Sequence, residues 1–185
     1  MVKLNSLLLI VVLALVTGCD RVKVNPGNTT TWQEQLEQSM ALLGHRNWIV
    51  VTDMAYPLQA RNGITTLFAE EPYMEVLSHV SDLIDSSPHL YAHVYLDREL
   101  SDLNESLCPG IENFRKEHQR VIPTANIIFT KHEDLIDKLD STSNKYQVVV
   151  IKTRLALPYT STFFELDCKY WDGEKQKRLE EIIGE

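Results

Sequence analysis

The amino-acid sequence predicts one α/β domain with three layers, in which helices cover both faces of a mostly parallel sheet and the last strand runs antiparallel. Helix-like and strand-like hydrophobic patterns alternate from residue 32 to residue 183, which is typical of such domains. The chain has 185 residues, of which 44% are hydrophobic, and this suits a single globular core. The last two strand-like segments lie too close together for an intervening helix, so we expect them to be antiparallel neighbours.

Helices are predicted where apolar residues recur every three or four positions. The first covers residues 32–43 and ends before Gly44, a common type of helix stop. Pro72 is suited to the first turn of the second helix. Thr130 and Glu133 have capping-box spacing and predict a helix start there. Two further helices are expected over residues 111–118 and 174–183.

Strands are predicted where short apolar runs stand between turn-forming residues. The clearest is Trp48–Thr52, and the others, in chain order, are residues 90–96, 125–129, 147–151 and 162–166. In sheets built from alternating strands and helices, ligand sites gather at the carboxyl ends of the strands. We therefore expect a site at that edge of the sheet.

The first residues, 1–18, predict a lipoprotein signal peptide rather than a part of the fold. Lys3 supplies a positive charge, residues 7–16 form an apolar stretch too short to span a bilayer comfortably, and "LVTGC" ends at Cys19. This stretch resembles a bacterial lipobox; the alternative is a signal anchor with an incidental cysteine. The lipobox is favoured because Gly18 and Cys19 directly follow the apolar stretch. It predicts a lipid on Cys19 and a chain anchored to a membrane outside the cytoplasm.

Lipidation would leave residues 19–31 as a polar, turn-rich tether and residues 32–185 as the folded domain. Asp20, directly after the cysteine, resembles an inner-membrane retention signal, which would place the domain on the periplasmic face. An oxidising compartment permits a disulfide between Cys108 and Cys168. Two free buried thiols are the alternative, because the sequence gives no distance between them.

Charge and motif content exclude several classes of function. The net charge of −8 argues against nucleic acid as a partner, because phosphate binding needs a basic face. The sequence has no phosphate-binding glycine loop, no serine nucleophile elbow and no Cys-x-x-Cys pair, so it predicts no cofactor. His89 and His93 lie in a predicted strand and do not share a helix face; we interpret them as surface or edge residues rather than metal ligands.

Two residues have chemistry of their own. His132 lies in the first turn of a predicted helix, where the helix dipole disfavours the imidazolium form and keeps the ring ready to exchange protons near pH 7. Tyr159 lies at a turn before the last strand, where its hydroxyl could bind a sugar and its ring could stack on one. Taken in isolation, His132 is explained as an exposed polar residue in the first turn of a helix. Tyr159 is explained as a residue that packs at the rim of the domain.

Three stretches together resemble the D-ribose pyranase and L-fucose mutarotase family (RbsD/FucU). They are "LLGHRNWIVVTDMAYP" from Leu42, "TKHEDL" from Thr130 and "VVVIKTRLALPYTSTFFEL" from Val148. The similarity covers residues 32 to 168, most of the predicted mature chain. The resemblance implies an enzyme that interconverts the ring forms of a free monosaccharide without a cofactor, and a ring-shaped homo-oligomer with sites between subunits.

The resemblance also implies roles for individual residues. The family's catalytic histidine falls on His45, and its sugar-contacting residues fall on Asp53, His132 and Tyr159. Two positions depart from the family's pattern. Its asparagine two residues after the tyrosine is Ser161 here, which we keep as a substrate-binding candidate. Its Gly-Glu pair before the turn is Thr153-Arg154.

The spacing of His45 and Asp53 constrains where they can act. They are eight positions apart around a strand, so an extended segment would separate them by roughly 26 Å. If both serve one sugar, a neighbouring subunit supplies one of them. Three hypotheses stand at this point: a mutarotase or pyranase-like isomerase, a binding module that holds a sugar without turnover, and an interaction protein that keeps only the oligomer.

Overall fold

The computed structural model describes residues 30–184. The predicted signal peptide, the lipidation candidate Cys19 and nearly all of the tether therefore lie outside the described residues. Between residues 30 and 184, no helix is both long and apolar enough to cross a membrane.

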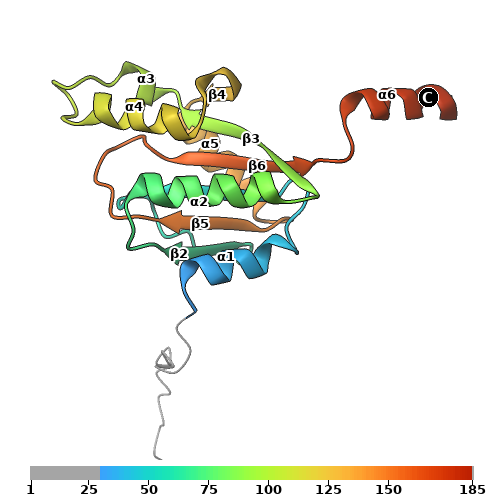
Figure 1. The fold of residues 1–185 in the computed structure, drawn as a ribbon, viewed down its shortest axis with the longest axis horizontal. Coiled ribbons are helices and arrows are strands. Elements are labelled where there is room, and N and C mark those ends of the chain that lie inside the picture. Colours follow the sequence, from blue (N-terminus) through green and yellow to red (C-terminus); the bar gives the residue numbers. More distant parts are fainter. Residues whose placement is uncertain (1–29, 185) are drawn as a thin grey trace, which may run out of the picture.

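A six-stranded mixed sheet forms the centre of the fold (Figure 1). Its spatial order is β2-β5-β1-β6-β3-β4, and β6 is antiparallel to both of its neighbours while the other pairs are parallel. The predicted α/β class with a mostly parallel sheet and an antiparallel last strand is confirmed. The strands are β1 (Trp48–Thr52), β2 (Ile64–Phe68), β3 (Leu90–Asp97), β4 (Ile127–Thr130), β5 (Val148–Lys152) and β6 (Thr162–Cys168).

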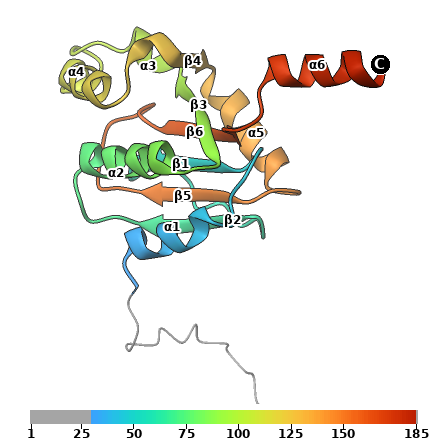
Figure 2. The ribbon, with the colours of Figure 1, turned by 45° about the vertical axis from the view of Figure 1, so that its right-hand side comes forward.

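Helices cover both faces of the sheet, as predicted (Figure 2). One face packs against α1, α2 and α4, and the other packs against α5. The helix α6 projects from the body beyond the end of β6 and buries none of its residues. The helices are α1 (Trp32–Met40), α2 (Tyr73–Ser86), α3 (Glu99–Asp102), α4 (Ile111–Val121), α5 (His132–Thr142) and α6 (Gly173–Ile183), with a 3-10 turn, η1, at Thr124–Asn126.

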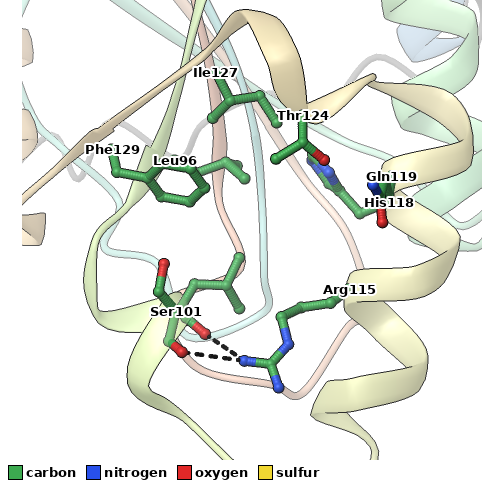
Figure 3. A pocket seen from close by; sticks show the side chains of 9 residues that line it. Leu96, Ser101, Arg115, His118, Gln119, Thr124, Ile127 and Phe129 are labelled. Atoms are coloured by element: carbon green, nitrogen blue, oxygen red, sulfur yellow. Dashed lines mark hydrogen bonds between the residues drawn. The ribbon is translucent and has the colours of Figure 1, made fainter.

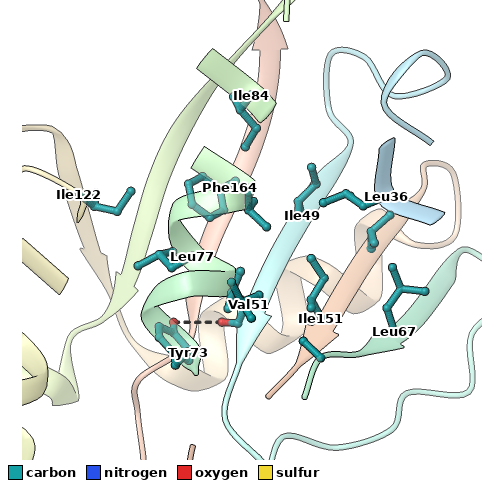
Figure 4. Close-up of a cluster of buried hydrophobic side chains, with 14 of the residues drawn as sticks. Leu36, Ile49, Val51, Leu67, Tyr73, Leu77, Ile84, Ile122, Ile151 and Phe164 are labelled. Carbon is teal, nitrogen blue, oxygen red and sulfur yellow. Dashed lines mark hydrogen bonds between the residues drawn. The ribbon is translucent and has the colours of Figure 1, made fainter. Parts of the chain in front are cut away.

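The larger core lies between the sheet and the helices α1, α2 and α4 (Figure 4). Ile49 and Val51 of β1 point into this core, whereas Trp48 and Val50 point into the smaller core beneath α5. A central strand covered on both faces needs apolar residues at every position rather than at alternate ones. The uninterrupted run in β1 is therefore the sequence signature of its central place in the sheet.

Several sequence-based predictions differ from the structure. The last two strands are not neighbours: β1 lies between β5 and β6, because residues 153–161 cross the end of β1 before β6 begins. The first helix ends at Met40, short of Gly44. The predicted cap at Thr130 is wrong, since Lys131 is the N-cap of α5 and makes no side-chain cap bond. A capping box occurs instead at Thr31 and Glu34 of α1.

Two elements were not predicted at all, and one question left open by the sequence is answered. The edge strand β2 and the short helix α3 are both additions to the sequence-based picture. The two described cysteines are free: Cys108 is buried just before α4, and Cys168 is the last residue of β6.

Candidate functional site

Polar residues from four segments meet at the carboxyl edge of the parallel strands. Asp53 directly follows β1, Asp97 ends β3, and His132 follows β4 at the start of α5. Thr162 of β6 pairs with Val51 on one side and with Leu96 on the other, so the preceding Ser161 lies between the ends of β1 and β3. The predicted position of a site at this edge is where these side chains gather.

His132 and Asp97 form the centre of this edge. The ring nitrogen Nδ1 of His132 lies 3.0 Å from Oδ2 of Asp97, and its backbone N–H donates to the carboxylate of Glu99 at 3.1 Å. With Nδ1–H directed at a carboxylate, neutral His132 keeps the lone pair of Nε2 free to act as an acceptor. Burial raises the pKa of Asp97, and the neighbouring His132 opposes that rise.

Two buried oxygen atoms at this edge have no hydrogen-bond partner among the described residues. They are Oδ1 of Asp97 and Oγ of Ser161, and both residues are almost fully inaccessible to solvent. A buried polar atom left unpaired costs about 1–3 kcal/mol, and native proteins rarely tolerate such groups outside functional sites. A ligand that carries hydroxyl groups would satisfy both atoms.

Tyr159 stands over the same edge in a strained backbone conformation. Its φ is 56°, in the left-handed region where a residue with a bulky side chain is uncommon. Its ring meets the His132 ring edge to face, with 5.4 Å between ring centroids. The hydroxyl of Thr160 donates to the Leu157 carbonyl at 2.7 Å and closes the turn. Strain of this kind concentrates at functional sites.

Asp53 is held by its own turn. Its Oδ1 accepts a hydrogen bond from the Ala55 amide at 2.7 Å, the pattern of an Asx turn. The turn places the buried Tyr56 near both carboxylates. Burial is the main cause that raises the pKa of the Tyr56 hydroxyl, with Asp97 and Asp53 adding to it, so this hydroxyl stays protonated as a donor.

A buried polar network supports the edge from the opposite face of the sheet. The Tyr73 hydroxyl donates to the Thr160 carbonyl at 2.6 Å and lies 2.8 Å from the Thr162 hydroxyl. Nε2 of His118 lies 2.9 Å from that same hydroxyl. Burial lowers the pKa of His118 to about 4. The network ties α2 and α4 to the start of β6, next to Ser161.

A small cavity of about 160 Å³ adjoins this network, between β3, β4 and α4 (Figure 3). Its lining is mostly apolar, with Leu96, Ile127 and Phe129 on the sheet side. Nη1 of Arg115 donates to the carbonyls of Leu100 and Leu103 at 3.0 and 2.9 Å. That guanidinium therefore fixes the turn after α3, and His118 is the lining residue that the cavity shares with the network.

His45 lies at the other end of β1, as its spacing from Asp53 predicts. Its Nδ1 is 2.5 Å from Oδ1 of Asp167, and Oδ2 of Asp167 accepts from the Tyr91 hydroxyl at 3.0 Å. Partial burial acts to raise the pKa of Asp167, but hydrogen bonds from the Cys168 amide, His45 and Tyr91 outweigh it and lower the pKa to about 2. The carboxylate is therefore charged and orients the imidazole.

Arg46 controls the second nitrogen of that imidazole. Its Nε donates to Nε2 of His45 at 3.0 Å, and its backbone φ is 72°. Arg46 and Tyr159 are the two described non-glycine residues with positive φ, one at each end of the sheet. His45 is thus held at both nitrogens, by Asp167 and by Arg46.

The structure brings four of the five predicted domain residues to one edge: Asp53, His132, Tyr159 and Ser161. It places His45 at the opposite edge. Sequence reasoning missed Asp97, although it ends an apolar strand just as Asp53 follows one. It also missed the contributing residues Tyr56, Glu99 and Asp167. In residues 30–184, no three His, Cys, Asp or Glu side chains converge as a metal-ligand set.

Thr153 and Arg154, which stand in place of the family's Gly-Glu pair, have structural roles here. The hydroxyl of buried Thr153 donates to the Thr52 carbonyl at 2.9 Å, which fixes the ends of β1 and β5 together. Arg154 forms an exposed ion pair with Glu70. These residues shape the rim of the carboxyl edge but add no acidic group to it.

Comparison with known proteins identifies the fold. No family model matches the sequence, and no curated protein matches it. RbsD from Bacillus subtilis, solved with D-ribose, is similar with a TM-score of 0.52 and 18% identity, over 72% of this chain and 91% of that one. The fucose mutarotase from Streptococcus pneumoniae, solved with L-fucose, has a TM-score of 0.51 and 16% identity, over 79% and 98%. The chain therefore has an RbsD/FucU-like fold, as its sequence resemblance implies.

Proposed function

We propose that this protein is a sugar mutarotase of the pyranase type, which interconverts the ring forms of a free monosaccharide by acid–base catalysis. The observation that carries the proposal is the pair of unpartnered buried oxygens, Asp97 Oδ1 and Ser161 Oγ. They lie among Asp53, His132 and Tyr159, so acceptors, an imidazole and a phenol surround one place. Such a set suits the many hydroxyl groups of a sugar. The fold similarity to two sugar-bound proteins supports the same substrate class.

The reaction needs only proton transfers. A base removes the proton of the anomeric hydroxyl, an acid protonates the ring oxygen, and the bond between the anomeric carbon and that oxygen breaks. The open chain then carries a carbonyl, and a hydroxyl closes on it again from either face. Because each proton removed at one oxygen is returned at another, an imidazole with a pKa near neutrality can serve both steps.

In this proposal His45 moves the proton and the carboxyl edge holds the sugar. The carboxylate of Asp167 accepts Nδ1–H of His45 and so leaves Nε2 as the reactive nitrogen. Nε2 accepts from Arg46 in the structure, so substrate binding must displace that guanidinium. At the other edge, Asp97 and Asp53 accept hydrogen bonds from sugar hydroxyl groups, and His132 and Tyr159 provide further contacts with the sugar.

The distance between the two edges leads us to propose a homo-oligomer with shared sites. His45 and Asp53 bracket β1, and residues at opposite ends of one strand cannot reach one small sugar. A neighbouring subunit would bring its own His45 to this subunit's carboxyl edge. Light scattering at micromolar concentration tests this, and a monomer there would contradict the shared site.

Non-catalytic sugar binding is the second candidate, and two observations favour it. Arg46 occupies the nitrogen that His45 would use as a base, and Ser161 stands where the family's asparagine would be. Exchange NMR on a panel of free sugars separates the two functions. Faster interconversion of ring forms with purified protein supports the mutarotase. Binding of a sugar with no change in exchange rate selects the binding module.

We also propose that the domain is attached to a bacterial membrane through a lipid on Cys19, on the extracytoplasmic side. The support is the lipobox-like "LVTGC" after a short apolar stretch. Replacing Cys19 with Ser should release the protein from the membrane fraction or block its processing. A variant that is processed and membrane-bound like the original would contradict lipidation.

A further inference from the structure

A C-terminal arm, residues 170–183, projects from the domain at the His45 edge. It follows β6, whose residue Asp167 contacts His45, and it includes α6, none of whose residues is buried. Both ribbon views show α6 extending past the end of β6 (Figure 1, Figure 2). An 11-residue helix is about 16 Å long, so the arm reaches well beyond the edge from which it starts.

The helix α6 has an apolar stripe that its own domain leaves open. Leu179, Ile182 and Ile183 are 38%, 80% and 56% exposed, and their spacing places them on one face of the helix. Lys177 and Glu181 lie on the opposite face. Apolar side chains gathered on one exposed face are typical of an interaction surface.

The base of the arm adds side chains of the types that contribute most to binding between proteins. Tyr170 and Trp171 are 68% and 42% exposed, and Nε1 of Trp171 donates to Oε1 of Gln176 at 3.1 Å, which ties the indole to the helix. Arg178 is exposed on the helix itself. Because Trp, Tyr and Arg are enriched at the strongest positions of protein interfaces, the arm is suited to a protein surface.

An apolar hollow of about 560 Å³ borders the carboxyl edge, between the start of α2, α4 and the segment that crosses from β5 to β6. Its apolar lining includes Met74, Phe114, Val121, Leu155 and Leu157. The charged residues that line it are Glu75, Glu117 and Arg120.

The charges of the arm complement those of the hollow. Lys175 lies one turn before Leu179, and Arg178 lies one turn before Ile182, so two cations lie beside the apolar stripe. Two of the three charged residues that line the hollow are acidic. The arm therefore offers an apolar stripe with cations beside it, and the hollow offers an apolar lining with two carboxylates.

We infer that α6 of one subunit binds in the apolar hollow of the next subunit of a homo-oligomer. The inference rests on the shared site of the proposed function, in which one subunit's His45 edge meets the next subunit's carboxyl edge. The arm starts at the first of these edges and the hollow borders the second, so one contact brings both pairs together. Because the stripe and the hollow are different surfaces of the same chain, the contact is heterologous and repeats from subunit to subunit.

A membrane surface is the less favoured partner for the arm. The predicted tether to Cys19 joins the domain at α1, which lies near β2, whereas α6 lies on the side of β3 and β4 in both views (Figure 1, Figure 2). A bilayer reached through Cys19 would therefore face the other side of the domain. The helix α6 also carries three glutamates, which anionic lipid headgroups repel.

Photo-cross-linking of the full-length protein in bacterial cells tests which surface covers the stripe. The photoreactive residue p-benzoylphenylalanine replaces Ile182, and the matched control carries it in place of Lys177 on the opposite face. We expect the Ile182 position to give a covalent dimer in which the linked peptide contains residues 72–75, 110–121 or 155–157, and the Lys177 position to give none. Cross-links to lipid or to another protein, without this dimer, would overturn the inference.

Substitution of the stripe measures its contribution to assembly. Ile182→Asp should raise the dissociation constant of the oligomer at least about tenfold, measured by analytical ultracentrifugation of the purified full-length protein in detergent. Lys177→Asp is the control and should leave it unchanged. Because α6 buries none of its residues, circular dichroism should show both variants folded.

The outcomes separate this inference from the proposed function. An Ile182→Asp oligomer as tight as the original, or an original protein that is monomeric, overturns the docked arm, whether or not ring-form exchange is observed. A dimer cross-linked through the hollow and weakened by Ile182→Asp, with no exchange activity on any sugar, supports the docked arm and counts against the mutarotase alone.

Discussion

The two edges of the sheet hold the same pair of side chains in different surroundings. At the carboxyl edge, Nδ1 of His132 faces Asp97, with the imidazole 26% exposed and the carboxylate fully buried. At the opposite edge, Nδ1 of His45 faces Asp167, with exposures of 54% and 26%. Both carboxylates fix the same tautomer of their histidine, and the surroundings separate what each pair can do.

This difference supports our proposal that one edge binds the sugar and the opposite edge transfers the proton. The carboxyl edge is strained at Tyr159 and holds two buried oxygens without partners, so it gains most from a bound hydroxyl ligand. The edge at His45 is open to solvent, and the charged carboxylate of Asp167 orients its imidazole. The buried pair, His132 and Asp97, is suited to bind a ligand. The exposed pair, His45 and Asp167, is suited to exchange protons with water, which supports the proposed base at His45.

Removing the exposed imidazole gives the largest expected effect. His45→Ala should slow ring-form exchange by about 100-fold or more, the usual contribution of a general acid–base group. Its unfolding free energy should change by no more than about 0.5 kcal/mol, because the side chain is exposed in a loop. Exchange NMR and urea denaturation measure the two effects.

His93→Ala is the matched control for that variant. His93 also approaches Asp167, at 3.4 Å, and is similarly exposed, yet it has no proposed part in proton transfer. Full exchange activity in His45→Ala would contradict proton transfer by His45 and make His132 the better candidate for the base.

Changing the buried pair should affect binding more than chemistry. Asp97→Asn keeps the shape of the side chain but removes a charged acceptor, and hydrogen bonds to charged groups contribute about 1.5–3 kcal/mol. Sugar affinity should therefore fall roughly 10- to 100-fold, measured by NMR titration. An unchanged dissociation constant would mean that the unpaired Oδ1 of Asp97 does not contact the sugar.

Lowering the pH should decrease the stability of the folded protein through His118, which lies in the buried network beneath the carboxyl edge. Burial lowers its pKa to about 4 in the folded protein, from an ordinary value of 6.5. Unfolding therefore takes up a proton as the pH falls below 6.5, and folded-state stability decreases until about pH 4. Between pH 7 and pH 5 the loss should be about 2 kcal/mol, at 1.36 kcal/mol per pH unit.

Urea denaturation at the two pH values measures that loss, and His118→Gln provides the comparison because glutamine does not titrate. The difference between the two proteins isolates His118 from the opposite contribution of Asp97, whose raised pKa favours the folded state as the pH falls. Equal pH dependence in both proteins would show that burial of His118 carries no such cost.

The smallest expected effect is that of one hydroxyl group. Tyr159→Phe keeps the ring against His132 and removes a single hydrogen bond to the sugar, about 0.5–1.5 kcal/mol, so affinity should fall roughly 2- to 10-fold. Tyr146→Phe is the control, since its hydroxyl meets Arg46 at the other edge. A larger loss of sugar affinity in Tyr146→Phe than in Tyr159→Phe would indicate that the sugar binds at the His45 edge.

Most of the fold follows from local patterns in the sequence, and the exceptions have physical reasons. The buried runs of β1 and β5 and the apolar stripe of α2 are strong signals because each packs against the core along its whole length. The strand β2 was missed because "ITTLF" lies at the sheet edge and buries only Leu67 fully. The chain order of β5 and β6 does not reveal that β1 separates them.

The site was predictable where a residue's role depends on its own position and not where it depends on a distant partner. Asp53 and Tyr159 follow from a strand end and a turn. Asp167 is 122 residues from His45, and Asp97 is 35 residues from His132. The first pairing depends on β6 lying beside β1 and the second on β4 lying beside β3, and no local pattern encodes either neighbour.

The central position of β6 has a consequence for biosynthesis. It is the last strand to leave the ribosome, yet it joins β1 to β3, so the two parallel parts of the sheet have no shared hydrogen bonds until it arrives. Until then β1 and β3 present open edges, which invite pairing with other chains. The domain can complete its fold only after synthesis of the final strand, and such long-range pairing is slow.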